Sequence, residues 1–215
     1  MFTRAVRTTA IFVIALFCRA EIVDRVAVTV ANQVITESQI LEAARLTAFL
    51  NDEPVDTSAA GKRKTADRLV EQILLRREMN LMHFSAPPES DIAPLLKQVK
   101  ARFKSQAEFQ AALRRSHISE AQLDRYLLWQ LTVLRFIDYR FRPSVQVSGA
   151  DLHAYYRKQV AEWQKKGVHP IPTFQQERDD IDKTLTEQRV SETLDRWLAE
   201  ARTQTQIVYH DEVFR

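Results

Sequence analysis

Apolar and small or polar positions alternate over residues 26–30, VAVTV. A period of two is typical of a β-strand, because successive side chains point to opposite faces. A second short run at residues 34–36 follows Asn32 and Gln33, so the two runs predict a hairpin. The other run of strand-like residues, TQIVYHD at 205–211, is remote in sequence. It lacks any nearer partner, so we expect it to join the hairpin in one small sheet.

The positions between these runs follow a helical period instead. Apolar residues recur every three or four positions, and several segments begin with Ser or Thr followed three residues later by Glu, Gln or Asp, which is the pattern of a capping box. The predicted helices cover approximately residues 36–50, 65–84, 90–103, 105–113, 120–141, 148–163 and 174–202. Residues 51–64 show no apolar period and are predicted to be a mobile loop. The expected fold is mainly α, a multi-helix body with one small β-sheet.

The predicted helix at residues 120–141 is apolar on two faces. One face carries Leu123, Leu127, Leu134, Ile137 and Phe141, and a nearly opposite face carries Trp129, Val133 and Phe136. A helix without a polar face is typically wedged between two layers, which favours core packing for both faces. The alternative is that the second face forms the floor of a groove for an apolar client. The candidate binding residues are then Tyr126, Trp129, Val133, Phe136 and Tyr139.

The first twenty residues have the pattern of a secretory signal peptide. Arg4 and Arg7 precede an apolar run at residues 10–18, and the small Ala20 could precede a cleavage site. A bilayer span needs about 20 apolar residues, so this run is too short, and a retained membrane anchor is the weaker alternative. We therefore predict a signal peptide at residues 1–20 and an exported protein.

Removal of this segment changes the charge balance. The chain has 31 Lys and Arg, 28 Asp and Glu and a formal net charge of +3, and three of its arginines lie in the first twenty residues. The mature chain would be neutral, which disfavours nucleic acid as a partner. The single cysteine, Cys18, is removed as well. An exported chain without disulfides must depend on its hydrophobic core for stability.

The sequence offers no constellation of catalytic residues. The five histidines lack the paired spacing of a metal site, and no nucleophile elbow or phosphate-binding glycine loop is present. The carboxylates at residues 177–182, ERDDID, are better explained as a solvated helix face near a helix N-terminus. The basic clusters at 62–64 and 114–115 are best explained as solubilising charge. We therefore expect no metal, cofactor or enzymatic activity.

Four parts of the chain together resemble the SurA family of periplasmic chaperones and foldases. They are VDRVAVTVANQVITESQI at the start, the predicted helices through residue 141, VSGADLHAYY at 147–156, and EQRVSETLDRWLAEARTQTQIVYHD at 187–211. That family inserts one or more parvulin-type prolyl isomerase domains between the last two segments. Only ten residues separate Trp163 from Phe174 in this chain, whereas an independent domain needs about 50 or more. The resemblance therefore implies a chaperone module without its isomerase.

The resemblance also implies a domain organisation and a function. Residues 21–165 would form the SurA-type N-terminal chaperone domain, 166–173 a short linker in place of the isomerase, and 174–215 the helix and strand that complete the domain. The implied function is an ATP-independent periplasmic holdase for unfolded outer-membrane proteins. The alternative is an adaptor or assembly protein that binds one specific partner or associates with itself. A homodimer formed by exchange of the C-terminal helix is also compatible with the sequence.

Overall fold

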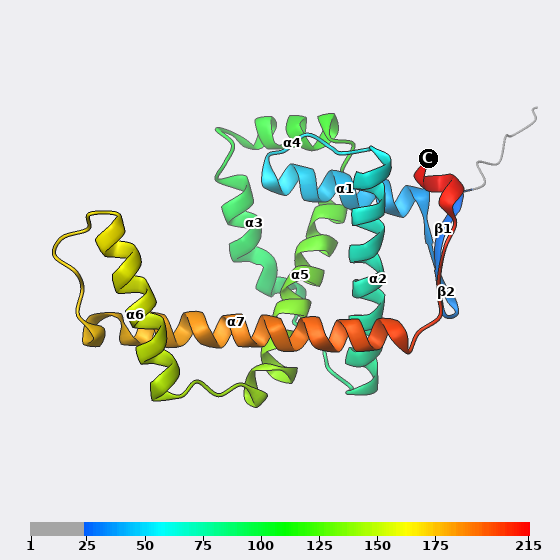
Figure 1. The fold of residues 1–215 in the computed structure, drawn as a ribbon. Coiled ribbons are helices and arrows are strands. Elements are labelled where there is room, and N and C mark those ends of the chain that lie inside the picture. The colour runs from blue at the N-terminus through cyan, green and yellow to red at the C-terminus, as the bar shows by residue number, and fades with distance from the viewer. Residues whose placement is uncertain (1–23) are drawn as a thin grey trace, which may run out of the picture.

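The computed structural model describes residues 24–215, so the predicted signal peptide at residues 1–20 lies outside the described residues. The fold is mainly α, with a small three-stranded antiparallel sheet, as predicted (Figure 1). The strands are β1 (Val26–Val30), β2 (Gln33–Thr36) and β3 (Ile207–Tyr209), and the helices are α1 (Glu37–Asn51), α2 (Ala59–Leu81), α3 (Ala93–Lys100), α4 (Gln106–Arg115), α5 (Glu120–Arg140), α6 (Gly149–Lys165) and α7 (Phe174–Thr203). Short 3₁₀ segments occupy Glu89–Ile92, Arg142–Ser144 and Asp211–Phe214.

The sheet joins the two ends of the described chain in the order β2-β1-β3. β1 is therefore central, with Thr29 opposite Val34 on one side and Val208 on the other. The pairing of β3 continues beyond the strand, because the His210 N–H donates to the Ala27 carbonyl at 2.9 Å and the Ala31 N–H donates to the Gln206 carbonyl at 2.8 Å. The prediction that the hairpin and the distant strand share one sheet is confirmed.

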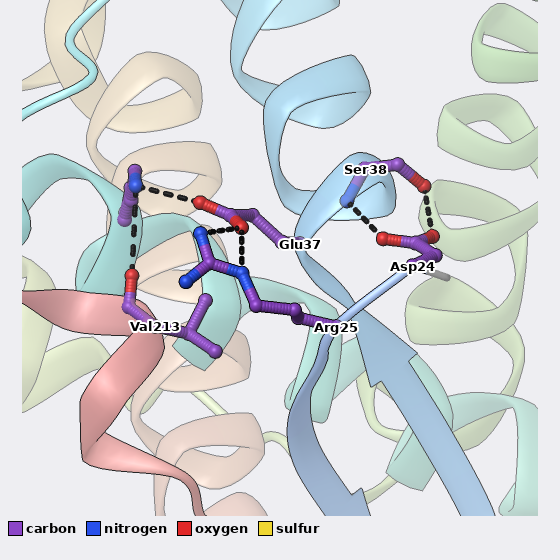
Figure 2. Close-up of polar contacts among 6 residues, drawn as sticks. Asp24, Arg25, Glu37, Ser38 and Val213 are labelled. Atoms are coloured by element: carbon purple, nitrogen blue, oxygen red, sulfur yellow. Dashed lines mark hydrogen bonds and ion pairs between the residues drawn. The ribbon is translucent and has the colours of Figure 1, made fainter. Parts of the chain in front are cut away.

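A cluster of polar contacts fastens these ends further (Figure 2). Glu37, the first residue of α1, accepts hydrogen bonds from Lys62 Nζ at 2.8 Å and Arg25 Nε at 2.9 Å. Lys62 also lies 3.5 Å from the carbonyl oxygen of Val213, and Asp24 accepts hydrogen bonds from the backbone and side chain of Ser38. The hydrogen bond from Lys62, followed by that from Arg25, keeps the pKa of Glu37 below its ordinary value. The cluster thus links β1, α1, α2 and the last 3₁₀ turn.

The predicted loop at residues 51–64 is wrong over half of its length, because residue 51 and residues 59–64 are helical. α1 continues to Asn51 and α2 begins at Ala59, one turn and a half before the predicted start. Ser58 caps α2 by accepting a hydrogen bond from the Gly61 N–H at 3.1 Å. Gly61 is buried, and a Cβ there would lie 2.3 Å from Cγ of Asp56. The first turns of α2 carry small and basic residues, so they show no apolar period although they are helical.

Three hydrophobic clusters form the core, and α5 contributes to two of them. The first lies between the sheet, α2 and the C-terminal segment, and includes Val28, Val70 and Val213. The second joins α1, α3, α4 and the first half of α5, and the third joins α2, the second half of α5 and α7. This change of partner along α5 explains its two apolar faces. Leu134, expected to share a face with Leu123, is instead 59% exposed.

The helix α6 packs on the first half of α7, and the two project from the body, whereas the second half of α7 packs on α2 and α5 (Figure 1). Residues 166–173 connect α6 to α7, and the Tyr156 hydroxyl donates to the Pro172 carbonyl at 2.7 Å. Phe174 stacks on His153 with ring centroids 4.0 Å apart. Leu152 of α6 and Ile181 of α7 are both buried, although most of their neighbours on these helices are exposed. This part of the fold therefore depends on few contacts.

We expect the contacts of Asp151, on α6, to make the stability of this projecting part depend on pH. The hydrogen bonds from Ser148, followed by the one from Arg189, lower the pKa of Asp151 to about 2. Its unfolded value is about 3.9. A carboxyl with a lowered folded pKa stabilises the fold above its unfolded pKa, and this contribution is lost as the pH falls through the folded pKa. Asp151→Ala should therefore lower the urea midpoint at pH 7, and the difference from wild type should shrink between pH 4 and pH 2.

The matched control is Asp182→Ala, which removes an exposed aspartate on α7. The difference between its urea midpoint and that of the wild type should stay small at every pH, because it loses only an exposed charge. A difference between wild type and Asp151→Ala that stays constant from pH 7 to pH 2 would contradict the assignment, because a purely structural loss is independent of protonation.

Candidate functional site

An open cleft of about 470 Å³ lies where β2, α1, α2 and α5 meet. Its volume is within the range of roughly 300–1,000 Å³ that is typical of ligand sites. No single element of the chain creates it, because the hairpin, two N-terminal helices and the central helix each contribute one side. Its lining residues are Gln33, Val34, Ile35, Gln39, Glu42, Ala43, Leu46, Leu69, Gln72, Ile73, Arg76, Gln122, Arg125, Tyr126 and Trp129.

Two aromatic side chains of α5, Tyr126 and Trp129, line the cleft. The guanidinium of Arg76 lies over the ring of Trp129, 4.3 Å from its centroid, which is a cation–π geometry. The Thr47 hydroxyl donates to the Ala43 carbonyl at 2.9 Å, so the Tyr126 hydroxyl, 3.2 Å from the Thr47 oxygen, acts as the donor between them. Both rings are therefore held in place by polar contacts at their edges or faces.

Four glutamines line the same cleft, and the structure orients two of their amides. Oε1 of Gln39 accepts a hydrogen bond from the Thr36 N–H at 2.9 Å, and Oε1 of Gln122 accepts one from the Ser119 N–H at 2.8 Å. A backbone N–H can donate only to the amide oxygen, so the NH₂ groups of both side chains remain available as donors. The capping boxes of α1 and α5 thus place two hydrogen-bond donors at the cleft. Such donors suit carbonyl oxygens of a bound molecule.

The charge of the cleft is positive by one unit. Arg76 and Arg125 line it together with Glu42. Among the ion pairs of residues 24–215, none involves either of these arginines or Glu42. The surface is therefore suited to a ligand that carries both apolar and polar groups and a modest negative charge.

The five candidate binding residues do not lie together. Tyr126 and Trp129 line the cleft, whereas Val133 and Phe136 belong to the third core cluster. Phe136 is fully buried and has no surface with which to contact a ligand. Tyr139 is 57% exposed and lies beside Phe84, with ring centroids 5.4 Å apart. The predicted stripe therefore leaves the cleft after its first turn and enters the core.

Sequence reasoning missed the lining residues from β2, α1 and α2. Leu69, Ile73 and Arg76 form one stripe on α2, with spacings of four and three residues that place them on one helix face. Leu69 and Ile73 also contact the first core cluster, so their spacing alone indicates packing. Arg76 continues the same face of α2, and a charged residue at that position is a sign in the sequence that this face is not fully buried.

Two further properties of the described residues concern the requirements of a metal site and of a membrane span. Within residues 24–215, no group of three or more His, Cys, Asp or Glu side chains is arranged to hold a metal ion. The helices of the same range include none with the length and apolar character needed to cross a membrane.

Comparison of the chain with models of known protein families gives no match, and comparison with curated proteins gives none either. The resemblance to the SurA family consequently rests on the residue patterns quoted above and stays a prediction.

Proposed function

We propose that the protein is an ATP-independent holdase that binds unfolded polypeptides in the cleft between β2, α2 and α5. In this proposal it acts in the periplasm, and its clients include unfolded outer-membrane proteins, which the SurA-like pattern implies. It is proposed to act by binding alone, without enzymatic activity or a cofactor.

The observation that carries the proposal is the combination of aromatic rings and free amide donors in one open cleft. Trp129 and Tyr126 can bury apolar side chains, and each fully buried large side chain contributes about 1.5–3 kcal/mol. The NH₂ groups of Gln39 and Gln122 can donate to backbone carbonyls, which every polypeptide carries regardless of its sequence. A surface of this kind favours broad and weak binding over recognition of one compact ligand.

The fold supports the same proposal in a second way. The aromatic rings are held by Arg76 and Thr47, so the cleft does not need a folded partner to order it. A pre-formed site lowers the entropic cost of binding a flexible chain. The lining is about equally polar and apolar in character, which would allow the empty protein to stay in solution.

The direct test is suppression of aggregation. A urea-denatured outer-membrane porin is diluted into buffer that contains the purified mature protein and no nucleotide, and light scattering is followed. We expect scattering to fall as the molar ratio rises and to be strongly reduced at severalfold excess. Lysozyme at equal concentration controls for unspecific crowding. Unchanged scattering at the highest ratio would contradict the holdase function.

The adaptor alternative predicts a different result in the same system. Affinity purification from a periplasmic extract should yield many substoichiometric outer-membrane proteins if the protein is a general holdase. A single stoichiometric partner, with no suppression of porin aggregation, would replace the holdase function by that of a dedicated assembly factor.

A further inference from the structure

The edge of the sheet that borders the cleft carries an unused pair of backbone hydrogen-bonding groups. β2 is an edge strand among the described residues, because the strand order is β2-β1-β3. Its side toward β1 is paired, and its other side borders the cleft through Gln33, Val34 and Ile35. The register of the sheet determines which of these residues directs its polar backbone groups outward.

Ala27 and Ala31 of the β1 segment form their hydrogen bonds with residues of the β3 segment, at His210 and Gln206. Backbone groups of successive strand residues point to opposite sides, so Val28 and Val30 direct theirs toward β2.

Their partners in β2 are Ile35 and Gln33. Val34 lies between them and therefore directs its N–H and C=O away from β1. Neither group forms a hydrogen bond with another described residue.

The next outward-facing position shows where such pairing would stop. The N–H of Thr36 is already bound to Oε1 of Gln39, as part of the α1 capping box. One residue, Val34, is thus free to exchange two hydrogen bonds with an added strand. Val34 is 51% exposed, and the open cleft lies beside this edge of the sheet.

The side-chain pattern of an added strand follows from the same register. Ile35 is buried on the face of the sheet that packs on α2, whereas Val34 points to the opposite face. A residue opposite Val34 would share its face and point to solvent. The residues immediately before and after it would point toward α2, where Leu69 and Ile73 line the cleft. An added strand therefore needs apolar residues at alternate positions.

The charge of the cleft adds a further requirement. Arg76 and Arg125 outnumber Glu42 among the lining residues, and neither arginine forms an ion pair with another residue of the range 24–215. A carboxylate on the bound strand would balance this excess. One kind of occupant fits the free backbone groups of Val34, the apolar side chains of Leu69 and Ile73, and the positive charge. It is an extended polypeptide segment with alternating apolar residues and one acidic residue.

We propose that the protein binds clients by adding an extended segment of the unfolded chain to β2, antiparallel or parallel, through the N–H and C=O of Val34. This inference rests on the proposed holdase function and names its mode of recognition and its client class. Segments with alternating apolar residues, the pattern of β-strands, are bound in preference to segments with helical periodicity.

The first experiment removes the outward N–H and leaves the β1–β2 bonds intact. Val34→Pro does this, because proline is tolerated in an edge strand where its nitrogen faces outward. Val34→Thr keeps the N–H and the β-branched shape. The probe is a short fluorescein-labelled synthetic peptide with alternating apolar residues and one aspartate, measured by fluorescence anisotropy. Val34→Pro should bind it about tenfold more weakly than Val34→Thr, since the hydrogen bond donated by the Val34 N–H is lost.

The second experiment uses the wild-type protein, so it stays decisive if Val34→Pro fails to fold by circular dichroism. A series of the same peptide carries one N-methyl group at each position in turn. One N-methylated position should weaken binding far more than its neighbours, because only the Val34 carbonyl is free to accept a hydrogen bond from the peptide. An Asp→Asn version of the peptide should bind more weakly at low salt.

The outcomes separate this inference from the holdase function. Equal binding by both Val34 variants, with no single sensitive position in the N-methyl series, overturns strand addition, while suppression of porin aggregation would leave the holdase function standing. Loss of both peptide binding and suppression in the wild type overturns the function itself. If sedimentation shows a wild-type dimer that Val34→Pro converts to a monomer, a second copy of the chain occupies this edge and the client proposal is wrong.

Discussion

Phe136→Ala is expected to lower the free energy of unfolding by about 3–5 kcal/mol, the range for a buried phenylalanine replaced by alanine. The Phe136 ring is fully buried and meets Phe84 and Phe141 edge-on, with centroid distances of 5.2 and 6.3 Å. Its removal would leave a cavity where α2, α5 and α7 meet. Urea denaturation followed by circular dichroism measures the loss directly.

Leu134→Ala provides the control on the same helix. Leu134 is 59% exposed, so its truncation should change the free energy of unfolding by no more than about 0.5 kcal/mol. If Phe136→Ala were as stable as wild type and instead lost client binding, the assignment of Phe136 to the core would be contradicted. The pair thus separates a packing role from a binding role on one helix.

Trp129→Ala is expected to weaken binding of the client peptide by roughly 30-fold, equivalent to about 2 kcal/mol, the threshold of a binding hot spot. Trp129 is the largest apolar side chain of the cleft, and Arg76 would lose its aromatic partner with it. Trp129→Phe should recover part of the affinity, because a smaller ring still fills some of the same space. Anisotropy titrations of the labelled peptide against each variant measure the difference.

Tyr139→Ala is the matched aromatic control for this effect. Tyr139 lies on α5 but outside the cleft lining, so its loss should leave peptide affinity near that of wild type. Equal loss of affinity in Tyr139→Ala and Trp129→Ala would place the binding surface elsewhere on α5. Because Trp129 also contacts the third core cluster, both variants need a thermal melt beside the titration.

Local signals in the sequence were sufficient for most of the fold. The Thr36–Gln39 and Ser119–Gln122 pairs mark the first turns of α1 and α5, and both capping boxes are present in the structure. The alternation at residues 26–30 predicted the central strand, and its distant partner followed because few other segments could pair with it. The start of α2 was missed, since its cap at Ser58 is followed by small and basic residues without an apolar period.

The candidate site was predicted only in part, for a physical reason. Trp129 and Phe136 are seven residues apart, two turns along the same stripe, and periodicity assigns them to one face. Only tertiary packing decides that the cleft ends between them, because α2 and α7 close over the second half of α5. The lining from β2 and α2 depends on how elements remote in sequence meet, which a local pattern does not encode.

The central place of β1 has a consequence for biosynthesis. Its partner β3 and the buried Val213 lie some 180 residues further along the chain. While the polypeptide leaves the ribosome or a translocation pore N-terminus first, β1 keeps one side unpaired until residues 207–213 emerge. Contacts of such long sequence separation form slowly. The three-stranded sheet therefore stays incomplete until nearly all of the described residues have been delivered.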